Sequence, residues 1–328
     1  MCVIVFMKKD GKMILAKNRD RIYKPKVEII REIINGVEVA YMHDTITNWI
    51  EGLNEHGLGM VNSALNVKYD ENEKRVSFKG SSGQKILNAL SKKNLDEMMD
   101  SILHYTYVSD VALQGHTLAS SPNKCIHIES TAQNTPIINQ YNKNVVFTNH
   151  GNNLENVGYA NGRKYISSLL RKKIMEEEIK NIDNSNQLLD SMNKNYINLD
   201  PRFHPYRHKQ STLKRINKND GKCFSTTSQI FLNLSDKILL FRYDMENCDF
   251  IKINNKLPEG YNPKIKINIE ETSKDKNKHN IPLEQKYVNN IISTYSNNKN
   301  TCLILFISLI IIITFLIYKI KYSGQRVK

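Results

Sequence analysis

Cysteine is scarce in this sequence, and its distribution excludes two common uses of the residue. Five cysteines are scattered over 328 residues: Cys2, Cys125, Cys223, Cys248 and Cys302. Their odd number and wide spacing do not suggest a disulfide framework, and no C-x-x-C pair suggests a zinc site. His204 and His208 lie four apart, but Pro205 and the lack of a nearby third ligand argue against a metal pair. We therefore expect a reducing compartment and neither a metal nor a cofactor.

Long apolar runs are also absent, except at the C-terminal end. Residues 302–318 (CLILFISLIIIITFLIY) contain no charge over 17 positions, which as a helix would span roughly 25 Å. We expect a single-pass membrane anchor at 301–319, followed by a basic tail at 320–328. The basic tail favours a cytoplasmic C-terminus, whereas the lack of a secretory signal favours a cytosolic main domain. The two indications conflict, so the orientation and the identity of the membrane stay open.

Acidic residues are fewer than basic ones, 33 against 47, which gives a formal net charge of +14. Such an excess can indicate contact with nucleic acid or anionic lipid. Here lysine is spread along the chain, with no basic stripe interleaved with aromatics, so we do not expect a nucleic-acid-binding protein. The apolar and charged fractions, 40% and 24%, are typical of a globular protein.

Turn signals between short apolar runs predict an antiparallel sheet that starts at the first residue. Asp10-Gly11 and Asn35-Gly36 each join two apolar runs and predict hairpins, and a third hairpin is expected within 45–65 with its turn at 54–57. Helices are predicted at 94–105, 162–179 and 187–192 from apolar spacing. Further strands are predicted within 116–130, 143–150 and 223–243. A polar, proline-broken stretch then predicts a linker at 250–300, which leaves 2–249 as the main domain.

Four segments carry the chemistry: CVIVFMKKDGKMILAKNRD, GLNEHGLGMVNSAL, VVFTNHGNN and STLKR followed by STTSQIFLNLSDKILLF. In their order and spacing they resemble the cysteine-type N-terminal nucleophile (Ntn) hydrolases, in particular choloylglycine hydrolases and acyl-CoA:6-aminopenicillanic-acid acyltransferases. The resemblance covers roughly residues 2–245. NRD also resembles part of an NRDE motif found in proteins with an N-terminal cysteine, although Arg21 stands where that motif has Glu. The resemblance implies an α+β fold, a four-layer αββα sandwich of two antiparallel sheets between helices.

The resemblance also implies the site residues. Cys2 is the expected nucleophile, Asp20 holds its amine or orients its thiol, and Asn149 and Asn62 are the expected oxyanion donors. For Asn62 the family residue could align one or two positions later. Arg215 matches an arginine beside the nucleophile, with Lys214 and Arg207 as alternatives. We expect three further residues to contact substrate: Lys17, which stands where the choloylglycine pattern has Arg, Arg19 and His150.

Cys2 suits this role on chemical grounds once Met1 is removed. A thiol with a pKa near 8.5 is only a few per cent thiolate at neutral pH, whereas an α-amino group with a pKa near 8 can accept a proton there. An N-terminal cysteine therefore combines nucleophile and base in one residue. The small side chain at position 2 should permit removal of Met1. A buried cysteine at the start of a strand is the alternative interpretation.

We therefore expect an amidohydrolase or acyltransferase that cleaves a linear C–N bond of a small N-acyl amide through a thioester acyl-enzyme. The membrane anchor would suit a lipid-like acyl group. Two alternatives remain open. The first is an inactive protein of the same fold that binds lipid or a small molecule at a membrane. The second is a membrane-tethered structural protein whose basic surface contacts anionic lipid or nucleic acid.

Overall fold

The computed structural model describes residues 2–21, 25, 27–65, 82–108, 113–131, 135–154, 159–160, 163–194, 196, 199, 203–207, 225–243 and 251–254. The chain forms two compact units, one of residues 1–195 and 200–280, the other of residues 196–199 and 281–328. All elements described below belong to the first unit. Arg215 and the predicted helix at 301–319 lie outside the described residues. Within the described part, no helix has the length and apolar character needed to cross a membrane.

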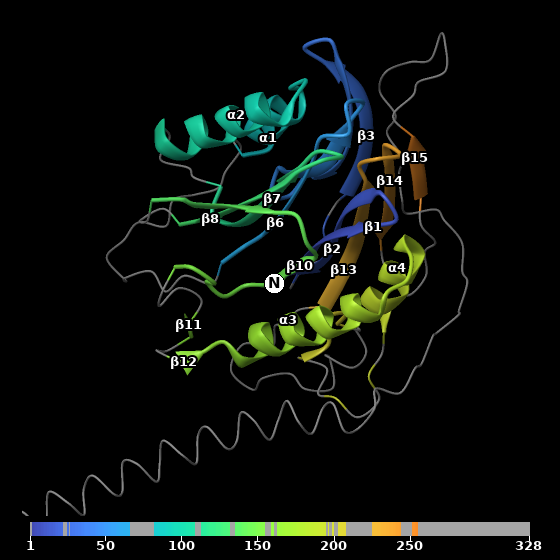
Figure 1. Ribbon diagram of the computed structural model, residues 1–328. Coiled ribbons are helices and arrows are strands. Elements are labelled where there is room, and N and C mark those ends of the chain that lie inside the picture. The colour runs from blue at the N-terminus through green and yellow to red at the C-terminus, as the bar shows by residue number, and fades with distance from the viewer. Residues whose placement is uncertain are drawn as a thin grey trace, which may run out of the picture. The chain divides into compact units, whose positions relative to one another are not determined.

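Two antiparallel sheets form the centre of the first unit (Figure 1). The six strands of the first sheet lie in the order β10 (Val145–Phe147), β1 (Cys2–Lys9), β2 (Lys12–Arg21), β13 (Ser225–Asn233), β14 (Ile238–Tyr243) and β15 (Ile251–Asn254). The seven strands of the second sheet follow chain order: β3 (Val27–Ile34), β4 (Val37–Asp44), β5 (Trp49–Asn54), β6 (Gly59–Ser63), β7 (Gly115–Ser120), β8 (Cys125–Ser130) and β9 (Ile137–Tyr141). A separate two-stranded ladder joins β11 (Tyr159–Ala160) and β12 (Arg163–Lys164).

Helices cover the outer face of each sheet, as Figure 1 shows. Helices α1 (Ser82–Leu90) and α2 (Leu95–Val108) share an apolar cluster with the second sheet. Helices α3 (Ile166–Glu178) and α4 (Ser185–Asn193), with the short 3-10 turn η1 (Ile179–Asn181) between them, share another cluster with the first sheet. A third cluster lies between the two sheets and contains residues of both. The predicted αββα sandwich is therefore confirmed.

The alternation of side chains along β1 and β2 determines which layer each residue faces. Ile4 and Phe6 of β1 belong to the core between the sheets, whereas Val3 and Val5 belong to the core under α3 and α4. On β2, Leu15 likewise faces the second sheet. It follows that Cys2, Lys17 and Arg19 face the second sheet, and that Asn18 and Asp20 face the helices.

The predicted hairpin turns are present where the sequence places them. Asp10 and Gly11 have φ values of 52° and 69°, and Asn35 and Gly36 have values of 51° and 74°. Two consecutive residues with positive φ are typical of the tight turn that matches the twist of a two-stranded ribbon. These local signals therefore establish β1–β2 and β3–β4 from a few residues each.

Besides the short strands β11 and β12 and the turn η1, three elements were not predicted from the sequence. Helix α1 precedes the predicted α2, β9 adds an edge strand to the second sheet, and β15 adds one to the first. Strand β15 runs to Asn254, so the sheet extends past residue 249, where we expected the linker to begin. Its pairing with β14 is a tertiary contact, and its four residues alone carry little signal.

Candidate active site

Cys2 is the first residue of β1 and lies opposite Arg19 of β2. Its side chain is buried, with 2% exposed. The Cys2 nitrogen donates a hydrogen bond to Oδ1 of Asn149 at 3.0 Å, although 147 positions separate the two residues in the sequence. Strand β10 ends at Phe147 beside β1, and this pairing brings Asn149 to the start of β1. The two residues that define the predicted site are therefore in direct contact.

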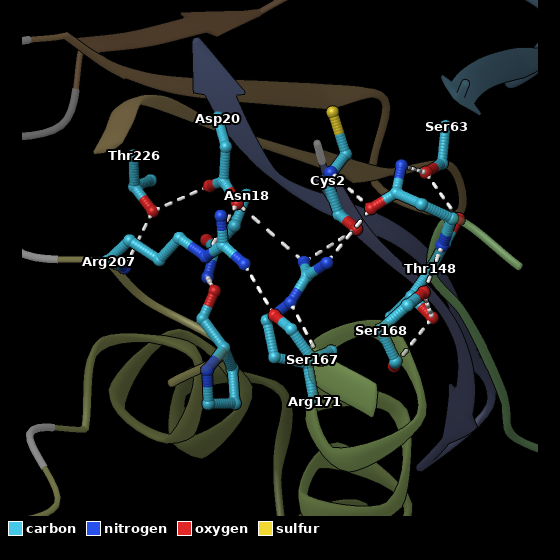
Figure 2. Close-up of polar contacts among 12 residues, drawn as sticks. Cys2, Asn18, Asp20, Ser63, Thr148, Ser167, Ser168, Arg171, Arg207 and Thr226 are labelled. Atoms are coloured by element: carbon cyan, nitrogen blue, oxygen red, sulfur yellow. Dashed lines mark hydrogen bonds and ion pairs between the residues drawn. The ribbon is translucent and has the colours of Figure 1, made fainter. Parts of the chain in front are cut away.

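Asn149 is buried, and its backbone N–H and both atoms of its side-chain amide have partners. Its Nδ2 donates to the Ser63 hydroxyl at 3.1 Å and to the Ala64 carbonyl at 2.6 Å, while its backbone N–H donates to the Ser168 hydroxyl at 2.7 Å. Figure 2 shows Ser63 and Ser168 on opposite sides of this segment. An oxyanion would therefore receive an Nδ2 proton only by replacing Ser63 or Ala64.

Arg171 of α3 is the site residue that the sequence did not single out. Its side chain is fully buried, and it donates to the Cys2 carbonyl at 3.0 Å and to Oδ1 of Asn149 at 2.9 Å. Burial lowers the pKa of Arg171 to about 10, and the nearby charge of Arg207 acts in the same direction. Since a guanidinium only donates, the contact fixes the orientation of the Asn149 carboxamide. One signal was available in the sequence: Arg171 lies four positions after Ser167 and three before Ile174, which places a charged residue on the buried side of α3.

Asp20 lies on the face of β2 that α3 covers and is fully buried. Its Oδ1 accepts a hydrogen bond from the Thr226 hydroxyl at 2.8 Å, and its Oδ2 lies 3.6 Å from both Nη1 of Arg171 and Nε of Arg207. Figure 2 shows this cluster on one side of Cys2 and the sulfur atom pointing away from Arg171. Asp20 is therefore connected to Cys2 through Arg171.

Lys17 and Arg19 connect the two sheets through buried ion pairs. Lys17 bonds Glu51 of β5, and Nη2 of Arg19 lies 2.7 Å from Oδ2 of Asp44 of β4. Both basic side chains are about 1% exposed. A substrate would reach them only if these pairs opened. Among the basic residues of β2, Arg21 comes nearest to the thiol, with Nη1 at 3.7 Å from Sγ.

The surrounding charges prepare the Cys2 thiol for ionisation. Burial raises the pKa of the thiol, but the positive charges of Lys17, the N-terminal amine of Met1 and Arg21 together outweigh it, against a smaller opposing effect of Asp20. The resulting pKa is about 7. By contrast, burial raises the pKa of Cys125 to about 12. At neutral pH Cys2 is therefore about half thiolate, whereas Cys125 is a thiol.

The structure separates Asn62 from the other predicted residues. Asn62 shares a face of β6 with Met60, which packs under the helices, and its Nδ2 donates to the Thr117 hydroxyl at 2.8 Å. Ser63, one position later, points toward the first sheet and reaches Asn149. The shift by one residue reverses the face because strand side chains alternate.

The remaining predicted residues have identifiable positions where the structure describes them. Nδ1 of His150 lies 2.9 Å from the Ser168 hydroxyl and 3.2 Å from that of Thr148, so His150 braces the segment that carries Asn149. Arg207, an alternative to Arg215, lies beside Asp20, and its Nη2 donates to the Ser167 hydroxyl at 2.6 Å.

His116, His127 and Glu129 have the donor atoms and spacing of a metal site, within 4.8 Å of one another. However, Nδ1 of His116 and Nε2 of His127 are 3.0 Å apart with ring centroids at 5.2 Å, so the rings lie end to end as in an N–H···N bond. The Glu129 carboxylate accepts from the N–H groups of residues 152–154 and from Nδ2 of Asn153. A carboxylate has about four acceptor positions, so a metal would have to displace these bonds. The cluster anchors the segment after Asn149.

No protein-family model matches the chain, and no curated protein matches its sequence. Among solved structures, a variant of conjugated bile acid hydrolase from Clostridium perfringens superposes with a TM-score of 0.50 at 14% identity, covering 87% of this chain and 99% of that one. The chain has the N-terminal nucleophile hydrolase fold. Another variant of the same hydrolase gives a TM-score of 0.49 at 14% identity, covering 87% and 100% of the two chains. Penicillin V acylase from Agrobacterium tumefaciens gives 0.47 at 12% identity, covering 77% and 86%.

The first of these likenesses confirms, at the level of the fold, the resemblance that the four sequence segments indicate.

Proposed function

We propose that the protein is an amidohydrolase that cleaves the linear C–N bond of an N-acyl substrate through the Cys2 thiol, after removal of Met1. The observation that carries the proposal is the position of Cys2. A thiol with a pKa of about 7 shares its residue with a nitrogen that Oδ1 of Asn149 holds at 3.0 Å. Nucleophile and base then form a unit of fixed geometry.

In the first half of the reaction, Sγ of Cys2 attacks the amide carbon and a C–S bond forms. The thiol proton passes to the α-amine, and the carbonyl oxygen becomes an oxyanion. Nδ2 of Asn149 belongs to the carboxamide whose Oδ1 binds the Cys2 nitrogen, and its bond to Ser63 is the longer of the two it makes. We assign the oxyanion to the position that Ser63 now occupies relative to this amide.

The oxyanion collapses with cleavage of the C–N bond, and the leaving nitrogen takes the proton from the Cys2 ammonium. The product is a thioester on Cys2 and a free amine. Water then attacks the thioester with the α-amine as base, and the carboxylic acid and thiol are released. An amine in place of water would give acyl transfer by the same steps.

The test is a panel of N-acyl amides with short, long and lipid-like acyl groups, followed by release of the amine and by intact mass of the quenched protein. We expect a thioester adduct on Cys2 and turnover that Cys2→Ala abolishes. Cys125→Ala is the matched control, because this second buried cysteine lies in the core between the sheets and should leave turnover unchanged. Turnover that persists in Cys2→Ala, or a protein that retains Met1, would contradict the mechanism.

A further inference from the structure

An enzyme that acylates its own N-terminal cysteine faces a specific side reaction. The inference rests on the function proposed above. In the thioester, attack of the neutral α-amine of Cys2 on the acyl carbon would close a five-membered ring. Attack by this amine forms a C–N bond and breaks the C–S bond, and one amine proton moves to sulfur. The products are an amide on the Cys2 nitrogen and a free thiol, and the amide removes the catalytic base.

Two hydrogen bonds oppose this ring closure, and both lead to one guanidinium. The Cys2 nitrogen is bound to Oδ1 of Asn149, and the same oxygen accepts from Nη2 of Arg171. The Cys2 carbonyl accepts from Nη1 of Arg171. Closing the ring requires the nitrogen to move toward the acyl carbon, away from Asn149. One hydrogen bond therefore holds the nitrogen of Cys2 and another holds its carbonyl, while the sulfur points away from Arg171 (Figure 2).

Arg171 is itself firmly placed. Its Nε donates to the Ser167 carbonyl at 3.2 Å, its Nη1 lies 3.6 Å from Oδ2 of Asp20, and the side chain is fully buried. We propose that Arg171 is a positioning residue that keeps the Cys2 amine from capturing the acyl group of its own thioester. Removal of Arg171 should convert a hydrolase into a protein that acylates its own N-terminus.

Arg207 provides the matched control. It lies 3.6 Å from the same carboxylate oxygen of Asp20 and is also buried. Its described hydrogen bonds go to Ser167 and Thr226, not to Cys2 or Asn149. Loss of Arg207 therefore disturbs the charge balance around Asp20 without releasing the Cys2 nitrogen.

The experiment uses 4-nitrophenyl acetate, an activated ester that acylates a reactive thiol whatever the natural substrate is. Wild-type protein with Met1 removed, Arg171→Gln, Arg171→Lys and Arg207→Gln are acetylated and quenched. Each is divided into samples with and without neutral hydroxylamine, which cleaves thioesters and leaves amides. Intact mass gives the resistant fraction, and fragmentation of the N-terminal peptide places the acetyl group on sulfur or nitrogen.

We expect hydroxylamine to remove the acetyl group from wild type and from Arg207→Gln. In Arg171→Gln the resistant fraction on the Cys2 nitrogen should rise about tenfold or more, as expected for the loss of hydrogen bonds to a charged group. Arg171→Lys should give an intermediate fraction, since one ammonium does not replace the two-pronged guanidinium.

Once Cys2 has been acetylated, any of three results would overturn the inference. The first is a folded Arg171→Gln protein whose adduct stays as labile as that of wild type. The second applies if that variant does not fold, and is an Arg171→Lys protein whose resistant fraction equals that of wild type. The third is a resistant amide that forms in wild type as fast as in the Arg171 variants. If the ester labels Cys2 but no amide is cleaved, the proposed function fails while the inference stands. If the ester does not acylate Cys2, both fail.

Discussion

Removal of the Lys17 charge should change how the Cys2 thiol reacts as a function of pH. Lys17 lies on the same face of β2 as the residue opposite Cys2, and it is the largest of the charges that lower the pKa of the thiol. We would replace the pair together, Lys17→Met with Glu51→Gln, because a single change leaves an unpaired buried charge. The glutamine retains an acceptor for the Asn62 N–H, which Glu51 now binds at 3.0 Å.

The size of the effect follows from the thiolate fraction. At a pKa of about 7 the thiol is about half ionised at pH 7, whereas at the ordinary value of about 8.5 the fraction is about 3%, roughly sixteenfold less. A more basic thiolate is also more nucleophilic, by about fivefold for a rise of this size. Loss of the Lys17 charge should raise the pKa of the thiol, and a variant whose thiol returned to the ordinary value would react about threefold more slowly with iodoacetamide at pH 7 and about fivefold faster near pH 10.

The assay is the alkylation rate of Cys2 against pH, read by intact mass and confirmed on the N-terminal peptide. Lys12→Met is the control: it removes a lysine from the far end of β2, where Lys12 pairs with Asp236 at an exposed position. Its profile should match that of wild type. Asp20, Arg21, Arg171 and the N-terminal amine remain in all three proteins, so their effects cancel.

Crossing of the two profiles is the decisive feature. A substitution that merely opened or closed access to the buried thiol would change the rate by one factor at every pH. Parallel profiles for the double variant and wild type, or an unchanged inflection near pH 7, would therefore refute the role assigned to Lys17.

Three further predictions concern stability, each measured by urea unfolding. His116→Phe keeps an aromatic ring beside Phe147 but loses the bond to the His150 carbonyl, 2.7 Å from Nε2, and should lower the unfolding free energy by about 1–3 kcal/mol. Burial lowers the pKa of His116 to about 4, so the unfolded chain binds the extra proton first. From pH 6.5 down to about 4, His116 should account for about 1.4 kcal/mol per pH unit of the fall in stability, so the slope of His116→Phe should be shallower by that amount; equal slopes would contradict this. Gly57→Ala should destabilise the protein more than Gly36→Ala. Both glycines have φ near +75°, but a Cβ at Gly57 would lie 2.5 Å from the Leu234 carbonyl oxygen, whereas a Cβ at Gly36 would have no atom within 4 Å.

The parts of the fold that the sequence predicted are those that short segments determine. A two-residue Asp-Gly or Asn-Gly turn fixes a hairpin, and the Asn94 side chain, which accepts from the Glu97 N–H at 2.9 Å, marks the start of α2. Strand β9 (IINQY) has no polar–apolar alternation and no fully buried residue, and β15 has four residues. Their pairing with β8 and β14 depends on the assembled sheets, which periodicity alone does not reveal.

The candidate site shows the same difference between residues that local motifs indicate and residues whose position depends on tertiary contacts. Cys2, Asp20 and Asn149 were predicted because each ends or begins a strand within a recognisable motif. Arg171 was missed because its spacing from Ile174 places it on the buried side of α3, but does not indicate that this side contacts Cys2 and Asn149. Asn62 was predicted because its amide suits an oxyanion hole, whereas the face on which it lies depends on the register of β6.

Strand β2 explains how the site tolerates Lys17 where a related pattern has arginine. Its side chains alternate, so Lys17 and Arg19 join the two sheets through Glu51 and Asp44, while Asp20 joins the first sheet to α3 through Arg171. An ion pair between the two sheets requires a buried positive charge, and an ammonium supplies that as well as a guanidinium does. Direct contact with sulfur is a separate role, and Arg21 at the strand end takes it at 3.7 Å. The requirement on the side of β2 that faces α3 is different. Arg171 binds two acceptors at once, so lysine should not replace it. Lysine is therefore accepted at position 17 of β2, where one positive charge is needed, and should not be accepted at Arg171 of α3, which binds two acceptors.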